Sequence, residues 1–594
     1  MCCTPSDPCD LTFTPSHSIV PSGLPPNPNQ YYNGCWPVDL TNIIKQIVSQ
    51  TCPTPTKPEF VFELTKEAAL KNYMILKRKY NSNFQAALRA QSDTPLGYGS
   101  EFRHPSSLEP LFSKHPNWDH LKSILLNGSD WKLEDIDENS RKKDLAEALK
   151  FGNHKGASDK PDLLKELVAK DVIYGYAMAL PLEKIEQFDE ICMAPMNIQP
   201  QHTIDEFGNI IDKERLTYDQ SFKWEEGSGT LVNSRVIDKS LKPVVFGHCI
   251  RRIINWVVAA RRKYPNYRIY CSKIDYKSAF RRMHLAWKTA LRTTTQLPEE
   301  GLAIISLRLT FGGKPCPSEW CTLSEMVTDL TNALLSEPNW DPESLYSPLS
   351  NELPEKKSLP DDIPLAEAKR LVVDIPVNGK GQTDCFIDDT SSLCVDVPGS
   401  DNVKRMERAT LLAIHTVARP EDPNEPIPRQ EMAARTKFLA EAGSDERKMI
   451  LGWLLNFRTL TITLPENKFI AWSNALQKLI DESETQAKEL EKNIGRMIHV
   501  AQILPEIYHF LNRLRGLHRR AKSRRKIKVP KKCTDNIELL IRFLKKARDG
   551  IDMNSIAYLL PDRVYRSDSC PHGLGDGMCR TNSSTAQPTI SSNT

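Results

Sequence analysis

The chain has 594 residues, which is more than one hydrophobic core accommodates, and its near-neutral formal charge of +4 singles out no class of partner. Hydrophobic residues make up 40% and charged residues 26%, as in folded globular proteins, and no apolar run reaches the roughly 20 residues of a membrane-spanning helix. Because the cysteines are too scattered for a disulfide framework and no secretory signal is present, we expect an intracellular protein, cytoplasmic or nuclear, with no membrane partner.

The N-terminal part of the chain changes from a polar leader to helical stretches. Residues 1–60 are rich in Pro, Ser, Thr and Asn, and we expect a disordered leader because they bury too little apolar surface to fold. Apolar residues recur at helical spacing over 64–91, and further helical stretches follow around 117–126 and 140–150. We therefore expect a helical N-terminal extension over residues 61–180.

Short strands next to helices replace this pattern in the middle of the chain. The run 268–275 predicts a strand that ends on a carboxylate, and 383–397 predicts two strands that meet at an acidic turn. Segments near 336–381 and 400–430 have the Pro-rich composition of surface insertions. The chain becomes helical from residue 469 onward, so the fold class we expect is α+β.

Three carboxylates at these strand ends are the candidate catalytic residues. Asp275 ends the first strand, and Asp388 and Asp389 occupy the acidic turn, where we expect Asp388 to face Asp275 directly and Asp389 to reach in from the turn. Carboxylate oxygens are natural ligands of Mg²⁺, and two such ions can activate a hydroxyl and stabilise a leaving phosphate group. Because an isolated Asp-Asp pair is more often a turn signal, the assignment depends on the neighbouring motifs.

Five ordered segments resemble the reverse transcriptase module of long-terminal-repeat, gypsy-like and tyrosine-recombinase retroelements. The segment Phe386–Asp389 resembles the family's aromatic-x-Asp-Asp box, and Asp275 followed five residues later by Phe280 resembles its first palm motif. The resemblance implies that Asp275, Asp388 and Asp389 are catalytic and bind two Mg²⁺ ions, or Mn²⁺. It also implies that Phe280 is a gate that excludes the ribose 2′-hydroxyl.

Two further segments resemble the substrate-binding motifs of the same family. Phe311, Gly312 and Gly313 resemble the Phe-Gly segment that contacts the template side, although Cys316 and its neighbours depart from the family pattern. Lys213 and Arg215 resemble the motif that meets the incoming triphosphate, for which the arginine fork suits phosphate oxygens. Without this context, a Gly-Gly turn and an exposed charged loop remain the alternatives.

The last part of the chain carries three weaker resemblances. Leu451, Gly452 and Trp453 resemble the primer grip, and either Lys437 or Lys448 matches the family's general acid for the leaving pyrophosphate. The basic run 511–532 fits binding along a template–primer backbone, with a solvated loop or a nuclear-import signal as alternatives. Asp568 resembles the first metal-binding carboxylate of a ribonuclease H domain, whose remaining strands are missing, so it would be vestigial.

The resemblance implies a right-hand polymerase with an antiparallel palm sheet. The expected divisions are a leader (1–60), the helical extension (61–180), fingers (181–270), palm with its two insertions (271–468), thumb or connection (469–550), a truncated ribonuclease H start (551–577) and a disordered tail (578–594). The implied activity is RNA-directed DNA polymerisation, a nucleotidyl transfer that uses an RNA template, a DNA primer and dNTPs.

Two alternatives to this activity remain open from the sequence. A degenerate retroelement relic would bind nucleic acid without polymerising, and the missing ribonuclease H end favours it. An RNA-dependent RNA polymerase would share the palm carboxylates, but Phe280 at the gate and the absence of a Gly-Asp-Asp box disfavour it. Host, template identity and oligomeric state do not follow from the sequence.

Overall fold

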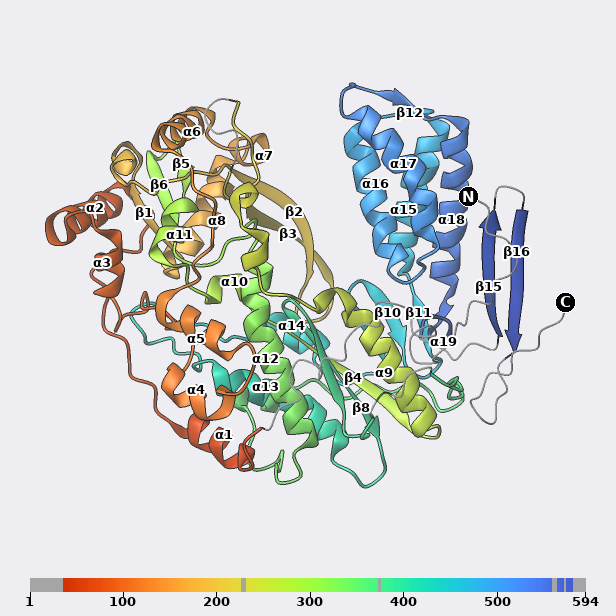
Figure 1. Ribbon diagram of the computed structural model, residues 1–594. Helices are drawn as coiled ribbons and strands as arrows, with labels where there is room; N and C mark the ends of the chain where they lie inside the picture. The colour runs from red at the N-terminus through yellow and green to blue at the C-terminus, as the bar shows by residue number, and fades with distance from the viewer. Residues whose placement is uncertain are drawn as a thin grey trace, which may run out of the picture.

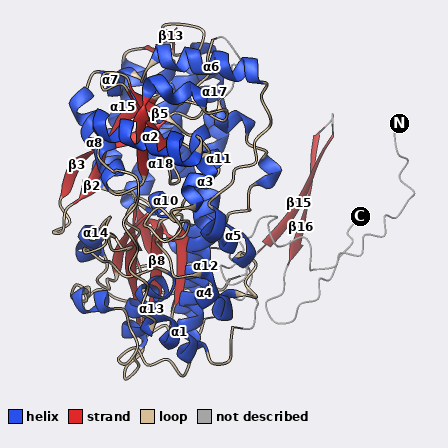
Figure 2. Cartoon of the chain, turned by 90° about the vertical axis from the view of Figure 1, so that its left-hand side faces the viewer, coloured by secondary structure: helices blue, strands red, loops and turns tan. Residues whose placement is uncertain are grey.

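The computed structural model describes residues 36–225, 231–371, 375, 377–557, and the backbone of strands 563–570 and 573–580. Figure 1 shows a large body built from mixed helices and strands, from which a bundle of long helices stands apart on one side. Figure 2 shows the same arrangement from the side, with strands enclosed between helices. No helix among the described residues is both long and apolar enough to cross a membrane.

The large body is organised on a three-stranded antiparallel sheet, which we call the central sheet. Its order is β4 (Arg268–Asp275), β8 (Asp389–Asp396) and β7 (Gln382–Phe386). Side chains of a strand alternate between its faces, and here both faces are apolar. Tyr270 and Cys394 belong to one hydrophobic core, whereas Ile269, Cys271 and Leu393 belong to the other. The central sheet is therefore covered on both faces, which explains its continuous apolar runs.

Two long helices cover one face of the central sheet, and a third packs against the other. The covering pair consists of α12 (Cys316–Ser336), which is buried along nearly its whole length, and α13 (Asn402–Val417). The third helix, α9 (Cys249–Lys263), presents its apolar residues to the second core. The segment near 400–430 was expected to be a surface insertion, and this is wrong for residues 402–417. They form a buried helix because Leu411, Leu412 and Ile414 are apolar.

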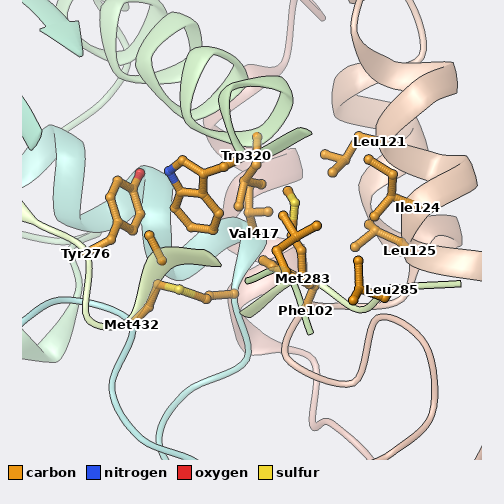
Figure 3. Packing of buried hydrophobic residues seen from close by; sticks show 14 of the residues in the cluster. Phe102, Leu121, Ile124, Leu125, Tyr276, Met283, Leu285, Trp320, Val417 and Met432 are labelled. Atoms are coloured by element: carbon orange, nitrogen blue, oxygen red, sulfur yellow. The ribbon is translucent and has the colours of Figure 1, made fainter. Parts of the chain in front are cut away.

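The N-terminal helices form part of the same body. They are α1 (Leu40–Ser49), α2 (Lys66–Tyr80), α3 (Phe84–Arg89), α4 (Pro105–Phe112), α5 (Trp118–Asn127), α6 (Glu138–Phe151), α7 (Lys155–Ser158) and α8 (Pro161–Ile173). Figure 3 shows Leu121, Ile124 and Leu125 of α5 close to Met283 and Trp320. This extension therefore completes the main core.

The leader expected over 1–60 contains a folded element. Helix α1 lies within it, and Leu40, Ile44 and Ile47 are buried where α1 packs against α4 and α13. These residues recur at helical spacing, a signal that the Pro-rich surroundings obscured. The expectation of disorder is therefore wrong for residues 40–49, while residues 1–35 lie outside the described part of the chain.

Two further groups of strands stand on the side of the body that carries the N-terminal helices. One sheet has the order β1 (Ala177–Pro181), β6 (Leu302–Ser306) and β5 (Thr295–Leu297). The other is a long hairpin of β2 (Met196–Ile204) and β3 (Ile210–Tyr218). Short helices α10 (Ala279–Arg282) and α11 (Trp287–Arg292) link β4 to β5. The pairing of β1 with β6 joins the expected helical extension (61–180) to the expected palm (271–468), so it crosses both of the expected domain boundaries.

The helical bundle follows a four-stranded sheet at its base. This sheet has the order β14 (Ile551–Asp552), β11 (Thr461–Thr463), β10 (Trp453–Asn456) and β9 (Arg447–Ile450), and α14 (Arg435–Glu441) precedes it. The bundle consists of α15 (Glu466–Asp481), α16 (Ala487–Ala501), α17 (Ile507–Ala521) and α18 (Lys531–Asp549). Strands β12 (Glu484–Thr485) and β13 (Ile527–Lys528) pair at its far end (Figure 1).

The C-terminal part consists of α19 (Met553–Ile556) and a two-stranded ribbon. Strands β15 (Arg563–Cys570) and β16 (Gly573–Arg580) pair antiparallel, so that Asp568 lies opposite Gly575. The side chain of Asp568 lies outside the described part of the structure. Its assignment as a vestigial ribonuclease H residue stays a prediction.

A buried ion pair joins α9 to β7, and we expect it to stabilise the central sheet. Arg252 donates two hydrogen bonds to Asp384, at 2.6 Å and 2.7 Å, and both side chains are buried. Asp384→Ala should lower the free energy of unfolding by about 3–5 kcal/mol, because it leaves a buried guanidinium without its partner. Urea unfolding measures this change.

The matched control is the exposed pair of Arg268 and Asp361, which also anchors a strand of the central sheet. Asp361→Ala should cost about 0–1 kcal/mol, since water screens an exposed pair. Equal losses in the two variants would contradict the structural role of Arg252 and Asp384.

Candidate functional site

Two of the predicted aspartates lie opposite each other on neighbouring strands. Asp275 is the last residue of β4 and Asp389 is the first residue of β8, and the antiparallel register pairs them directly. The expectation that Asp388 faces Asp275 directly is therefore wrong. The reason is the strand boundary, because β8 begins at Asp389 and leaves Asp388 in the turn.

The turn that carries Asp388 is fixed by contacts with its surroundings. Ile387 has a left-handed backbone conformation with φ of +57°. Its carbonyl oxygen accepts a hydrogen bond from the Nε1 of Trp320 on α12 at 2.9 Å, and the Tyr276 amide donates to the Asp388 carbonyl oxygen at 3.1 Å. Trp320 is fully buried and packs edge-on against Tyr276 (Figure 3). Trp320 and Tyr276 thus hold the acidic turn from both sides.

The three carboxylates lie in a partly buried, acidic part of the structure. Burial and the charge of Asp389 together raise the pKa of Asp275 to about 7, against the lowering effect of Lys437. Burial and Asp389 also raise the pKa of Asp388. Both shifts have the physical cause expected where like charges share a desolvated site. Such a cluster gains stability from a cation.

Lysines supply positive charge to this cluster in the structure. Lys437 on α14 places its Nζ 2.8 Å from the Oδ2 of Asp275. Lys273 lies 3.3 Å from the Oδ1 of Asp389 and 3.3 Å from Glu441. Sequence reasoning missed Lys273, although its position two residues before Asp275 places both on one face of β4.

The two lysines considered for the general acid lie in different surroundings. Lys448 is buried, and its Nζ donates to the carbonyl oxygens of Glu441 and Gly443 at 2.7 Å and 2.6 Å. Lys437 contacts Asp275 and keeps part of its side chain in solvent. Of the two, only Lys437 is brought to the carboxylates.

The carboxylates fit Mg²⁺ in chemistry and in charge. Burial, and then the charge of Asp389, raises the pKa of Asp275 and of Asp388, and a divalent cation would stabilise such hard oxygen donors in their charged form. Among the described residues, however, no three His, Cys, Asp or Glu side chains are grouped closely enough to hold a metal ion. Asp275 and Asp389 are the pair that the fold holds together, while Asp388 would have to turn toward them.

Aromatic and basic residues from distant segments line the space beside the carboxylates. The rings of Phe280 and Phe311 lie 5.1 Å apart, and the guanidinium of Arg215 lies over the Phe311 ring at 4.8 Å. Burial lowers the pKa of Lys213, and the positive charges of Arg215 and Lys437 lower it further. The fold therefore gathers four of the predicted substrate-binding residues, Phe280, Phe311, Arg215 and Lys213. The positive charge of the last two suits an anionic group.

Both predicted template-side glycines are required by internal packing. Gly312 has a φ of +135°, and a Cβ there would lie 1.8 Å from the carbonyl oxygen of Tyr218. A Cβ on Gly313 would lie 2.4 Å from the ring of Trp131. The structure thus gives each glycine a packing role, and their contact with a template stays a prediction.

The predicted primer grip is a tight hairpin that joins the body to the helical bundle. Leu451 and Gly452 form the turn between β9 and β10, with φ values of +48° and +79°. Trp453 is fully buried and stacks on His499 of α16, with ring centroids 5.5 Å apart. The Nζ of Lys468 donates to the Gly452 carbonyl oxygen at 3.0 Å. Trp453 is therefore an anchor for the bundle, whereas Leu451 and Gly452 are partly exposed.

The basic run lies at the end of the helical bundle that is remote from the carboxylates. Its most concentrated part joins the end of α17 to the start of α18 around β13 (Figure 1). All the following side chains are exposed: Arg519, Arg520, Lys522, Arg524, Arg525, Lys526, Lys528, Lys531 and Lys532. A single partner that contacts both this basic surface and the carboxylates has to be long.

Comparison with known proteins gives a distant likeness to solved structures. No protein-family model and no curated protein matches the chain. The chain is similar to a foamy viral protease-reverse transcriptase dRH in complex with double-stranded DNA, with 13% identity, a TM-score of 0.38, and coverage of 94% of this chain and 69% of that one. A foamy viral protease-reverse transcriptase in complex with double-stranded DNA gives 13% identity and a TM-score of 0.37, with 78% and 69% covered. Likeness at this level does not establish a function.

Substitution of Gly312 tests the close approach of the loop to the β2–β3 hairpin. Gly312→Ala should lower the free energy of unfolding by about 3 kcal/mol, because the added Cβ meets the Tyr218 backbone in a strained conformation. Gly208→Ala is the matched control, since Gly208 also has positive φ but has no atom within 4 Å of the added Cβ. In the control, the free energy of unfolding should fall by about 1 kcal/mol. Similar losses in urea unfolding would show that packing does not constrain Gly312.

Proposed function

We propose that this protein is an RNA-directed DNA polymerase that extends a DNA primer on an RNA template. The observation that carries the proposal is one surface assembled from four distant segments. It joins the pair Asp275 and Asp389 with the group of Phe280, Phe311 and Arg215, and the charge of Arg215 acts on the neighbouring Asp388. Acidic ligands for a cation beside a basic and aromatic surface suit a nucleoside triphosphate.

In this proposal each residue acts on a defined part of the reaction. Asp275, Asp388 and Asp389 would hold two Mg²⁺ ions, which would supply charge neutralisation and favour the deprotonated primer hydroxyl. The 3′-oxygen attacks the α-phosphorus of a dNTP, and the bond to pyrophosphate breaks. Arg215 would bind phosphate oxygens, and Lys437, which lies beside Asp275, would give a proton to the leaving group. Catalysis is mainly positioning and charge stabilisation.

The proposal also assigns parts of the fold. The central sheet is the palm, the β2–β3 hairpin with its neighbours is the fingers, and the helical bundle is the thumb. The exposed basic end of the thumb would bind the phosphates of a long template–primer duplex. The finer assignment to gypsy-like or tyrosine-recombinase retroelements rests on the sequence motifs alone, and the similar foamy viral structures give it no support.

A second candidate is a retroelement relic that binds nucleic acid without polymerising. One observation favours it: Lys437 and Lys273 already pair with Asp275 and Asp389, so the fold neutralises both charges without a metal. The basic surface would still bind nucleic acid in such a relic. Because binding alone would not distinguish the two candidates, polymerisation and binding are measured separately.

Primer extension with dNTPs and Mg²⁺ on an RNA template tests the proposed activity. Asp275→Asn and Asp389→Asn should each reduce extension by about 1,000-fold, because the remaining carboxylates would bind less well the Mg²⁺ ions that neutralise the charge of the reacting phosphate. Asp396→Asn is the matched control, since Asp396 lies at the far end of the same strand β8 and pairs with Lys356 at the surface. It should extend normally. An intact chain that binds primer–template but extends no better than Asp275→Asn is the relic.

Replacement of the gate residue tests the choice of sugar. Phe280→Ala should raise the efficiency of rNTP incorporation relative to dNTP by about 10- to 100-fold, because the ring would no longer meet the 2′-hydroxyl. Single-nucleotide extension with each substrate gives the ratio within one variant, which makes it independent of the overall loss of activity. An unchanged ratio would remove Phe280 from the gate.

A further inference from the structure

Helix α10 carries a buried arginine, Arg281, directly after the gate residue Phe280. Arg281 is only 4% exposed. A buried guanidinium is costly unless acceptors surround it, so its partners indicate what the position does. No step of the proposed reaction uses Arg281.

Three segments that are far apart in the chain supply acceptors for Arg281. Its Nη2 donates to the Oδ2 of Asp171 on α8 at 2.5 Å and to the hydroxyl oxygen of Tyr218 on β3 at 2.7 Å. Its Nη1 donates to the carbonyl oxygen of Leu309 at 3.3 Å. The Tyr218 hydroxyl in turn donates to the same Asp171 oxygen at 3.0 Å. Arg281, Asp171 and Tyr218 therefore form a closed hydrogen-bonded group, which we call the arginine triad.

The arginine triad is charged and mostly shielded from water. The side chains of Arg281 and Asp171 are 5% and 19% exposed. Burial opposes the charged form of Arg281, but the charge of Asp171 outweighs burial, and the pKa of Arg281 is raised. Burial also raises the pKa of Tyr218, so its hydroxyl keeps the proton that it donates. Charged hydrogen bonds in such a place are strong and depend on geometry, so the triad fixes α10 relative to α8 and β3.

The arginine triad also holds the backbone on both sides of the aromatic pair in the proposed nucleotide site. Phe280 precedes Arg281, and Leu309, which accepts from Arg281, lies two residues before Phe311. The Tyr218 amide donates to the Phe311 carbonyl oxygen at 2.9 Å. The rings of Phe280 and Phe311 lie 5.1 Å apart, so the contacts close into a circuit. One guanidinium therefore controls the separation of the two rings.

The two sides of the aromatic pair are held unequally. The loop that carries the second ring has a further anchor, since the Nδ2 of Asn233 donates to the Gly312 carbonyl oxygen at 2.7 Å. Helix α10 is a single turn without a side-chain cap. Its other buried arginine, Arg282, binds different backbone carbonyl oxygens. Without Arg281, α10 would keep that one anchor and could tilt, which would move Phe280.

We propose that Arg281 is a positioning residue for sugar selection, which sets the distance between the Phe280 ring and the 2′ position of the incoming nucleotide. Asp171 and Tyr218 act with it, so α8 of the N-terminal extension takes part in selecting the nucleotide. This inference rests on the proposed function for the identity of the substrate, a deoxynucleoside triphosphate. Arg281 is buried and acts through Phe280, not by contact with the substrate.

Nucleotide binding without transfer tests this role. The full chain is bound, in Mg²⁺, to an RNA template and a DNA primer that ends in a dideoxynucleotide, and dATP or ATP is titrated opposite a template uridine. Protection of the complex from excess heparin gives the affinity for each nucleotide. The ratio of the two affinities is the sugar preference. Unfolded protein lowers the amplitude of protection but leaves the midpoint, and hence this ratio, unchanged.

The variants remove the guanidinium, the ring or both. Arg281→Met should lower the preference for dATP by about 10-fold, toward the value of Phe280→Ala, because a small displacement of a positioned group has a large effect. Added to Phe280→Ala, it should change the ratio no further, since the ring that Arg281 positions is absent. Tyr218→Phe removes one hydroxyl and keeps the backbone bond to Phe311, so the preference should fall by about 3-fold.

Arg405 on α13 is the matched control. It is also buried, lies over the Trp340 ring at 4.8 Å and donates to backbone carbonyl oxygens, much as Arg281 lies over the Tyr218 ring at 5.0 Å. Arg405→Met should lower the midpoint of urea unfolding as Arg281→Met does, but keep the sugar preference. Arg281→Lys keeps a charge beside Asp171 and should recover part of the preference.

The outcomes separate this inference from the proposed function. Equal sugar preference in Arg281→Met and Arg405→Met, or a further loss when Arg281→Met is added to Phe280→Ala, overturns the positioning role. If Arg281→Met does not fold, an unchanged preference in Tyr218→Phe overturns it instead.

Primer extension by the intact chain completes the comparison. If Arg281→Met lowers the sugar preference but the intact chain does not extend an unblocked primer, polymerisation fails while the positioning role stands. If the intact chain extends the primer and Arg281→Met keeps the full preference, the reverse holds. A complex that neither nucleotide protects overturns both.

Discussion

The main constraint on the structure is that the carboxylates of Asp275 and Asp389 lie close together in a partly buried position. Asp275 and Asp389 repel each other, and burial strengthens this repulsion because little water screens it. The strand register imposes their proximity, and the hydrophobic cores on both faces of the central sheet hold that register. Lys437 and Lys273 offset part of the repulsion. Packing thus keeps two like charges close together at one end of the central sheet, where a cation would stabilise them.

The surroundings of the central sheet are built to resist that repulsion. Trp320 connects the acidic turn to α12, and the bidentate pair of Arg252 and Asp384 connects α9 to β7. On the opposite side, Arg282 donates to Glu101 at 2.8 Å and so links the first residues after β4 to the N-terminal extension. These buried polar contacts need exact partners, since an unpaired buried charge is costly. The N-terminal extension is therefore part of the support of the site.

Local sequence patterns predicted the residues of the site better than the arrangement among them. Alternation and motif order indicated β4, β7 and β8, and they singled out Asp275, Phe280, Phe311 and Arg215, which the fold brings together. They placed Asp388 opposite Asp275, whereas the strand boundary gives that position to Asp389. Composition also misassigned α1 and α13, because proline-rich neighbours outweighed their short apolar repeats.

By itself, the sequence determined which chemistry the chain can carry: acidic strand ends, an aromatic residue five positions after Asp275, and a basic segment near the end. Each of these is a local property, set by side-chain type and by the period of a strand or helix. Only the tertiary structure decided which lysine meets Asp275, why Gly312 has no side chain, and that Arg281 joins Asp171 to Tyr218. These facts depend on contacts between residues far apart in the chain, which no local pattern encodes.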